Sequence, residues 1–205
     1  MDGLIAIDVA ILPPPAVSDA ARALSAGLPA GESQGLRLDA SHLPHITLTQ
    51  QFIPAKDVPA AAVAIAGVLP QRAPLALAIT GPGRGSSSVW MRVERSPALL
   101  DLHEALMEAL EPFERTTGTS SAFAGGDARA GDVTWVAGFR RNSSFRSFTP
   151  HITLGHASTL PSVQPCAFTA TTIALCQLGR FCSCREVLAC WTLPVSRTPA
   201  DPVDV

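Results

Sequence analysis

The sequence Pro-His-Ile-Thr-Leu occurs twice in this chain of 205 residues, at 44–48 and at 150–154. The β-branched and aliphatic residues of each copy predict a β-strand. Because successive side chains of a strand point to opposite faces, His45 and Thr47 share one face of the first copy, and the isoleucine and leucine share the other. Each copy is therefore expected to present an imidazole and a hydroxyl on one face and to anchor itself in a core with the other.

If the two strands face one another, His45 and Thr47 lie opposite His151 and Thr153. An unperturbed imidazole titrates near pH 6.5, so that one histidine can accept a proton while the other donates one. Threonine hydroxyls between them suit the non-bridging oxygens of a phosphate. Neither copy has a neighbouring nucleophile and carboxylate in an obvious triad, and the sequence contains no G-x-S-x-G segment and no P-loop. Attack at phosphorus therefore fits these residues better than acyl transfer.

The paired segments resemble the two H-x-T-x motifs of the two-histidine (2H) phosphoesterase superfamily, which includes 2′-5′ RNA ligase-like proteins and cyclic nucleotide phosphodiesterases. Phe148, Thr149 and Pro150 before the second motif are also similar to that family, and the resemblance extends to about Leu193. It implies a bilobal, pseudo-symmetric α+β fold, with antiparallel sheets, helices on the outside and a central cleft. It also implies hydrolysis of a 2′,3′-cyclic phosphate, or of a related cyclic or 2′-5′ phosphodiester, without metal or cofactor.

By the same resemblance His45 and His151 are the acid–base pair, and Thr47 and Thr153 bind the phosphate. The resemblance does not assign the acid and the base. The partner it implies is a nucleotide or an RNA terminus carrying a cyclic phosphate. Two alternatives stay open, a 2′-5′ RNA ligase and a non-catalytic protein that binds nucleotides or RNA ends.

The chain contains no tyrosine, so any stacking on a nucleobase must come from phenylalanine or tryptophan. Phe52, Trp90 and Phe148 are the candidates by position. Trp90 alternates with Val89 and Met91 on an expected strand, which favours core packing unless the indole faces the cleft.

A formal net charge of −2 and a pI near 6.2 argue against a broad nucleic-acid-binding surface but allow a single nucleotide or RNA end. Three arginines, Arg140, Arg141 and Arg146, precede the second motif. A guanidinium matches the geometry of phosphate, so Arg146 and its neighbours are candidate substrate-binding residues. The competing interpretation is a solvated basic loop.

The other histidines are given less weight. His42 is expected in a loop, and His103 at a partly exposed position of a helix. His156 follows the second motif closely enough to reach the rim of a cleft.

All five cysteines fall between residues 166 and 190, and their odd number argues against a disulfide framework. Cys182-x-Cys184 does not have the usual spacing of a zinc knuckle, and no histidine follows at ligand distance. Buried or loop thiols are therefore preferred to a zinc site.

The N-terminus has no basic segment, and no apolar run approaches the roughly 18 residues that a membrane span needs. We expect a cytoplasmic monomer without membrane contact. Residues 1–193 are expected to form one two-lobed domain, and residues 194–205 a disordered tail.

Hairpins recur without the regular spacing of βαβ units, which favours α+β with antiparallel sheets. Ser96 and Pro97 are typical of a helix start, and an apolar stripe follows them. The expected helices are 17–28, 58–69 and 97–110. The expected strands are 4–12, 45–53, 75–80, 88–94, 133–139, 151–154, 171–178 and 186–193. Segments 81–85 and 116–131 are expected to be mobile.

Overall fold

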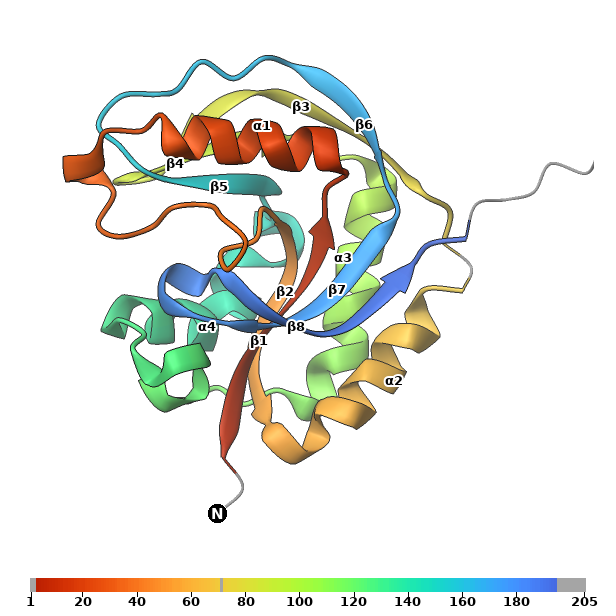
Figure 1. The fold of residues 1–205 in the computed structure, drawn as a ribbon. Helices are drawn as coiled ribbons and strands as arrows, with labels where there is room; N and C mark the ends of the chain where they lie inside the picture. Colours follow the sequence, from red (N-terminus) through yellow and green to blue (C-terminus); the bar gives the residue numbers. More distant parts are fainter. Residues whose placement is uncertain (1–2, 71, 195–205) are drawn as a thin grey trace, which may run out of the picture.

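Two four-stranded antiparallel sheets form the framework of the computed structural model, which describes residues 3–70 and 72–194 (Figure 1). The first sheet has the order β2–β1–β7–β8, with strands at Ile46–Pro54, Leu4–Leu12, Thr172–Leu178 and Cys184–Thr192. The second has the order β5–β4–β3–β6, with strands at His151–His156, Ser88–Val93, Leu75–Arg84 and Cys166–Ala170. The predicted α+β class with antiparallel sheets is confirmed.

Each copy of the repeated segment leads into an edge strand, β2 in one sheet and β5 in the other, and these two edges contact each other. The predicted alternation of faces is present in both. Ile46 and Leu48 are fully buried in the core, and so are Ile152 and Leu154. Burial of such side chains stabilises the fold by roughly 1.5–3 kcal/mol each, which fixes the register because a slip of one residue would bring the polar face into the core.

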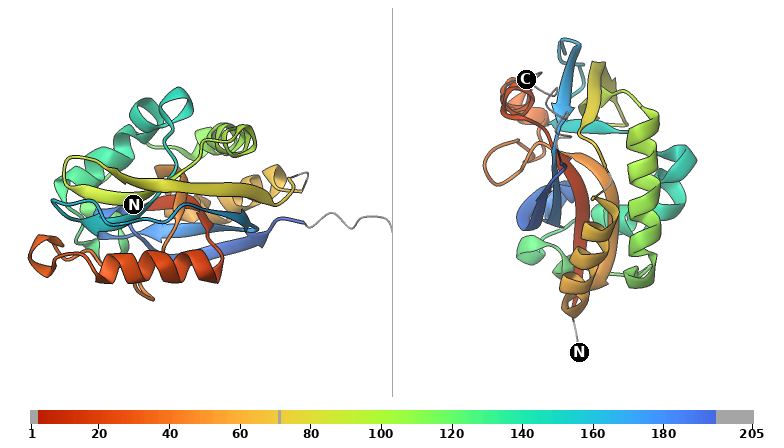
Figure 2. Two further views of the ribbon diagram at one scale, coloured as in Figure 1. Left: turned by 90° about the horizontal axis from the view of Figure 1, so that it is seen from above. Right: turned by 90° about the vertical axis from the view of Figure 1, so that its right-hand side faces the viewer.

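Over the described part of the chain, four α-helices pack on the sheets: α1 (Pro15–Ala26), α2 (Val58–Val68), α3 (Pro97–Leu110) and α4 (Ala130–Ser143). Helix α1 lies on the opposite side of the sheets from α2, α3 and α4 (Figure 2). The start of α3 is as predicted, since the Ser96 hydroxyl accepts the backbone N–H of Leu99 at 3.3 Å. The leucine stripe of α3 is fully buried.

The two sheets do not correspond to the two halves of the chain. The predicted hairpin of β7 and β8 returns to the first sheet and pairs with β1. The first sheet therefore contains strands from the beginning of the chain, β1 and β2, and from its later part, β7 and β8. Strand β7 lies between β1 and β8. Strand β6 was not predicted.

The prediction of a strand at 133–139 is wrong, because these residues form the middle of α4. Apolar residues alternate over this segment, but the buried side chains Asp132, Val136 and Phe139 follow a spacing of four and three. That spacing is helical, and Asp132 reinforces the start of the helix by accepting the backbone N–H of Arg129 at 2.9 Å.

Segments 81–85 and 116–131 also differ from their prediction as flexible loops. Strand β3 continues through Gly81 to Arg84 and stays paired with β4, with an irregularity in register at Gly81, where φ is +135°. Segment 116–131 contains two short 3₁₀ turns, η4 (Ser120–Ala122) and η5 (Ala124–Gly126). Phe123 between them is buried against Phe52, so the segment is packed onto the first sheet.

Within residues 3–70 and 72–194, no helix combines the length and the hydropathy needed to cross a membrane. The disordered tail predicted for 194–205 falls, except for its first residue, outside the described residues.

Candidate active site

A cleft of about 610 Å³ lies where the edges of the two sheets meet, and both repeated motifs line it. His45 and Thr47 come from the first motif, and His151 and Thr153 from the second. The structure thus brings together the four residues on which the sequence argument depends. Further walls come from α4, from the residues before each motif and from the turn between β7 and β8.

The two imidazoles are held in the same way. The Nδ1 atom of His45 is 2.7 Å from the carbonyl oxygen of Leu43, and that of His151 is 2.7 Å from the carbonyl oxygen of Thr149. Since a carbonyl only accepts, Nδ1 carries the proton in both rings. Each neutral histidine therefore keeps Nε2 as the basic atom.

Burial lowers the pKa of His45 and the pKa of His151, against the hydrogen bond from each ring to its carbonyl. For His151, the proximity of His45 lowers the pKa further. Both rings consequently favour the neutral form when the cleft holds no anion. An anionic phosphate between them would favour protonation of one ring, because an opposite charge stabilises the cation.

A buried carboxyl lies below the first motif. Oδ2 of Asp8, in the middle of β1, accepts the Thr47 hydroxyl at 2.7 Å and the Gln50 amide at 2.8 Å. It is 3.8 Å from Nε2 of His45. Burial raises the pKa of Asp8 to about 7, although the hydrogen bonds from Gln50 and Thr47 oppose that rise. The amide oxygen of Gln50 accepts the indole N–H of Trp135 at 2.9 Å, which connects this carboxyl to the rim of the cleft.

One wall of the cleft is organised by Asp132 of α4. Its carboxylate accepts hydrogen bonds from the Arg129 guanidinium, from the backbone N–H of Arg129 and from the backbone N–H of Phe181. The guanidinium of Arg129 also lies 4.0 Å from the centre of the Phe181 ring. Helix α4 and the turn between β7 and β8 are therefore fastened to each other beside the motifs. Among the described residues, Arg129 is the one arginine or lysine that lines the cleft.

We expect Asp132→Asn to lower the free energy of unfolding at pH 7 by about 1–3 kcal/mol, the usual effect of weakening buried hydrogen bonds to a charged group. Burial opposes ionisation of Asp132, but the hydrogen bonds from Arg129 and Phe181 outweigh it and lower its pKa. A carboxyl with a lowered folded-state pKa contributes stability above its unfolded pKa, about 3.9, and loses it as the pH falls through the folded value. The difference between wild type and variant should therefore shrink below about pH 4, as urea denaturation would show.

The control for this measurement is Asp127→Asn, because Asp127 is a nearby exposed aspartate. Its free energy of unfolding should stay within about 0.5 kcal/mol of the wild-type value, both at pH 7 and below about pH 4. If the loss of unfolding free energy in Asp132→Asn is the same at both pH values, the ionised carboxylate of Asp132 does not provide the stabilisation.

The remaining candidates for substrate binding occupy different places. Phe148 lines the cleft, but one ring face stacks on His103 with centroids 4.0 Å apart and the residue is 4% exposed. Trp90 packs its indole against the His151 ring, with centroids 4.7 Å apart, and does not line the cleft. Arg146 is exposed and also outside the cleft lining. Phe52 is fully buried against Phe123, so its assignment as a stacking residue is wrong.

Arg140 and Arg141 are on α4, where they line a smaller hollow of about 480 Å³ that contains neither motif. Arg140 forms an ion pair with Glu114 and donates to the carbonyl oxygen of Met107. Its position on a helix corrects the interpretation of a solvated loop. Because Arg140 is paired away from the cleft, the structure does not bring it to a substrate phosphate there.

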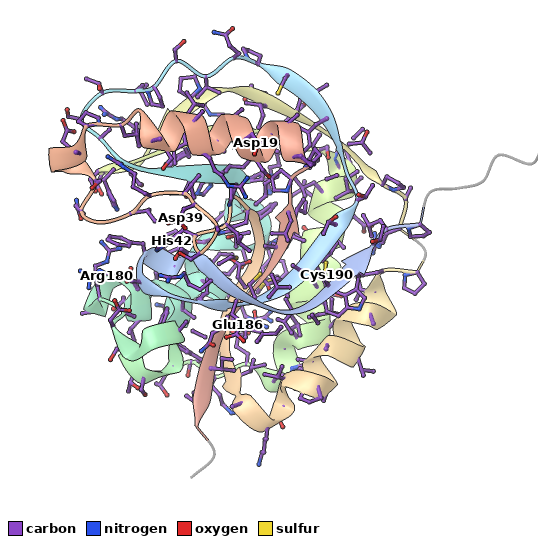
Figure 3. The ribbon with its side chains drawn as sticks, in the orientation of Figure 1. Asp19, Asp39, His42, Arg180, Glu186 and Cys190 are labelled. Atoms are coloured by element: carbon purple, nitrogen blue, oxygen red, sulfur yellow. The ribbon has the colours of Figure 1, made fainter. Side chains whose placement is uncertain are left out.

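Three further histidines were assigned from the sequence. His42 lies in the loop before β2, as expected, beside Asp39 (Figure 3). His103 is fully buried, so the prediction of a partly exposed position is wrong: Nδ1 donates to the Leu48 carbonyl oxygen at 2.6 Å, and Nε2 accepts the backbone N–H of Phe145 at 2.8 Å. His156 lines the cleft, and its Nδ1 is 3.1 Å from the Ser87 hydroxyl.

Sequence reasoning missed Asp8, Arg129 and Trp135 as residues of the site. Asp8 is the one charged residue within an otherwise apolar strand, and that exception was the available signal. Recognition of the helix at 130–143 would have placed Arg129, Asp132 and Trp135 on one end of α4. Nothing in the sequence indicates which loop that end faces.

Comparisons with known proteins agree with this geometry. The model of the family described as "2′-5′ RNA ligase superfamily" matches residues 13–178. A search of curated protein sequences finds no match. Among solved structures, the fold is similar to TT0787 of Thermus thermophilus, with a TM-score of 0.58 and 18% identity, over 94% of this chain and 100% of that one. It is also similar to E. coli LigT complexed with NADP+, with a TM-score of 0.61 and 18% identity, over 93% of this chain and 98% of that one.

Proposed function

The chain belongs to the 2′-5′ RNA ligase superfamily, and on that premise we propose that it hydrolyses a 2′,3′-cyclic phosphate, or a related cyclic or 2′-5′ phosphodiester, of a nucleotide or RNA end. The observation that carries the proposal is the matched orientation of His45 and His151. Each ring donates Nδ1–H to the carbonyl of the second residue before it and lines the same cleft. Two basic nitrogen atoms facing one cleft suit a reaction in which one proton is removed and another is supplied.

In the proposed reaction, Nε2 of one histidine takes a proton from water as the water oxygen bonds to phosphorus. The bond from phosphorus to the ester oxygen breaks on the opposite side, and the second histidine gives that oxygen a proton. Each proton transfer of this kind contributes about 10²–10⁴-fold to the rate. The chemistry uses only protein groups and water.

The hydroxyl of Thr153 is the proposed donor to a non-bridging oxygen, where negative charge increases in the transition state. The Thr47 hydroxyl donates to Asp8 in this structure, so it is proposed to turn from that carboxyl toward the phosphate when substrate binds. Arg129 is a further candidate, because it is the cleft-lining cation among the described residues. Part of its guanidinium is already held by Asp132 at 2.6 Å, which orients it.

A nucleotide is the proposed substrate class. The volume of about 610 Å³ is in the range of small-molecule sites, and Trp135 is 49% exposed at the rim, where a base can stack. E. coli LigT, to which the fold is similar, has been crystallised with 3′-AMP. The five cysteines are free thiols, which suits activity in the reducing cytoplasm. A 2′-5′ RNA ligase that runs the reverse reaction at the same cleft is the second candidate, favoured by the family's description.

The test is hydrolysis of the four 2′,3′-cyclic mononucleotides, of an oligoribonucleotide ending in a cyclic phosphate, and of a 2′-5′ dinucleotide, all in excess EDTA. We expect turnover of at least one of them, with a product that identifies the leaving oxygen as 2′ or 3′. A preparation of His151→Ala, purified in the same way, controls for contaminating nucleases. Absence of turnover on every substrate would contradict hydrolysis, and ligation of RNA ends by the same preparation would then establish the second candidate.

A further inference from the structure

Three potential metal ligands from distant parts of the sequence meet below the cleft. Asp8 comes from the middle of β1, His45 precedes β2, and Cys184 begins β8. One ligand atom of each residue lies within 4.8 Å of those of the other two. Asp8 and Cys184 are fully buried, and the His45 side chain is 11% exposed where it lines the cleft.

The distances are close to those of a tetrahedral zinc site. Bonds of about 2.0–2.3 Å to nitrogen, oxygen and sulfur place such ligands roughly 3.3–3.8 Å apart. Nε2 of His45 is already 3.8 Å from Oδ2 of Asp8. The remaining distances are at most 4.8 Å, so they must close by no more than about 1.5 Å when the ion binds. Three protein ligands leave a fourth tetrahedral position for water.

The Asp8 carboxyl provides an independent indication of a missing partner. Its Oδ2 accepts two hydrogen bonds, but Oδ1 is buried and has no hydrogen-bond partner among the described residues. A buried oxygen without a partner is costly. A cation held by both oxygens of this carboxyl would satisfy Oδ1 while lying beside Oδ2, the oxygen nearer to His45.

We propose that Asp8, His45 and Cys184 form a zinc-binding site whose occupation blocks the hydrolytic cleft. A thiolate, a neutral imidazole and a carboxylate are ligands that zinc prefers, and softer or harder ions match this set less well. On binding, the Cys184 thiol loses its proton to solvent. The thiolate and the carboxylate then balance the two charges of the ion, so that the buried site is neutral.

Zinc at this site removes His45 from catalysis, because the metal takes the Nε2 lone pair that would accept a proton. His151 has no equivalent cluster among the described residues. The two motifs would therefore differ in their response to metal. This inference goes beyond the proposed hydrolysis, which needs no metal.

The first measurement is direct binding to the metal-stripped, reduced full chain, independent of activity. We expect one equivalent of zinc in competition with a chromophoric chelator, and a thiolate-to-metal charge-transfer band when Co²⁺ replaces it. Imidazole ¹⁵N spectra of the wild-type protein should show a shift of Nε2 in His45 and little change in His151. This last measurement needs no variant and so does not depend on how well a variant folds.

Variants then identify the ligands. Cys184→Ser should abolish the charge-transfer band, and Asp8→Asn or His45→Ala should weaken zinc binding by at least about tenfold. Three matched substitutions should retain the band. Cys182→Ser changes a neighbouring thiol that lines the cleft, and His151→Ala changes the histidine of the other motif. Cys190→Ser changes an exposed thiol farther along β8 (Figure 3). Circular dichroism without metal checks the fold of each.

The proposal is overturned if the wild-type chain gives no charge-transfer band at one equivalent, if the band survives in Cys184→Ser, or if Cys182→Ser removes it. Where hydrolysis is measurable, zinc should inhibit the wild type reversibly, and Cys184→Ser should need at least about tenfold more zinc for the same inhibition. Failure of the hydrolysis assay leaves the binding measurements intact, so the two proposals are judged separately.

Discussion

Substitution of His151 by alanine is expected to lower kcat for hydrolysis of a cyclic phosphodiester by about 10²–10⁴-fold, the usual contribution of one general acid or base. His45→Ala should have an effect of the same order, because both residues line the same cleft and both rings keep Nε2 as the basic atom. Thr47→Ala and Thr153→Ala should cost less, since each removes one donor and leaves proton transfer intact. Steady-state kinetics on the substrate found in the EDTA assay provides the comparison.

The thermal midpoint of each histidine variant should fall only modestly, because each lost ring hydrogen bond goes to a carbonyl two residues away. The larger decrease is expected for His151→Ala, which also removes the contact with the Trp90 ring. The matched control is His42→Ala. His42 is three residues before His45 but is held by Asp39 and Arg185 and does not line the cleft. Wild-type kcat in a folded His45→Ala or His151→Ala variant would contradict the proposed acid–base roles.

The repeated motif was the most informative part of the sequence because its geometry is local. The alternation of His45 and Thr47 with buried aliphatic residues follows from the period of a strand, and the structure has it in both copies. That the two strands lie at facing edges of separate sheets is a matter of topology. The return of β7 and β8 to the first sheet depends on contacts far apart in the chain, which no local pattern encodes.

The sequence was least informative where residues of one site come from distant elements. Asp8 and Cys184 meet beside His45 only because β1, the start of β2 and the start of β8 converge. The spacing of Cys182-x-Cys184 reports only on neighbours in the sequence, so it could not indicate that Asp8 and His45 lie beside Cys184. At 133–139, alternation of apolar residues over a few positions resembled a strand, and the buried spacing of α4 shows that the helical period prevailed.

The two motifs are alike in how they hold their histidines and unlike in what surrounds them. His45 has a buried carboxyl at 3.8 Å, whereas His151 has the indole of Trp90, with ring centroids 4.7 Å apart. Burial is nevertheless the largest influence on both rings and lowers the pKa of each. The surroundings, rather than the repeated residues, thus distinguish the two histidines.

The second large effect is expected from Phe123→Ala, which should lower the free energy of unfolding by about 3–5 kcal/mol. Phe123 is 2% exposed and meets Phe52 edge to face, with centroids 5.8 Å apart. The two rings belong to a small cluster with residues of β1, β7, α4 and η4: Ala6, Leu178, Val136 and Ala122. The backbone of segment 116–131 also packs closely on the Phe52 ring, since a Cβ added at Gly118 would lie 2.6 Å from that ring. Removal of the ring leaves a cavity that these neighbours cannot fill without moving the segment.

Urea denaturation at neutral pH measures this effect as a shift of the midpoint at unchanged slope. Leu160→Ala is the control, because Leu160 is a large apolar residue that is 48% exposed, and it should cost no more than about 0.5 kcal/mol. If segment 116–131 were a mobile loop, as its glycine-rich sequence predicts, Phe123→Ala would be as mild as the control. A large loss would instead show that Phe123 packs this segment onto the first sheet and onto Val136 of α4, the helix that also contributes Asp132 and Trp135 to the cleft.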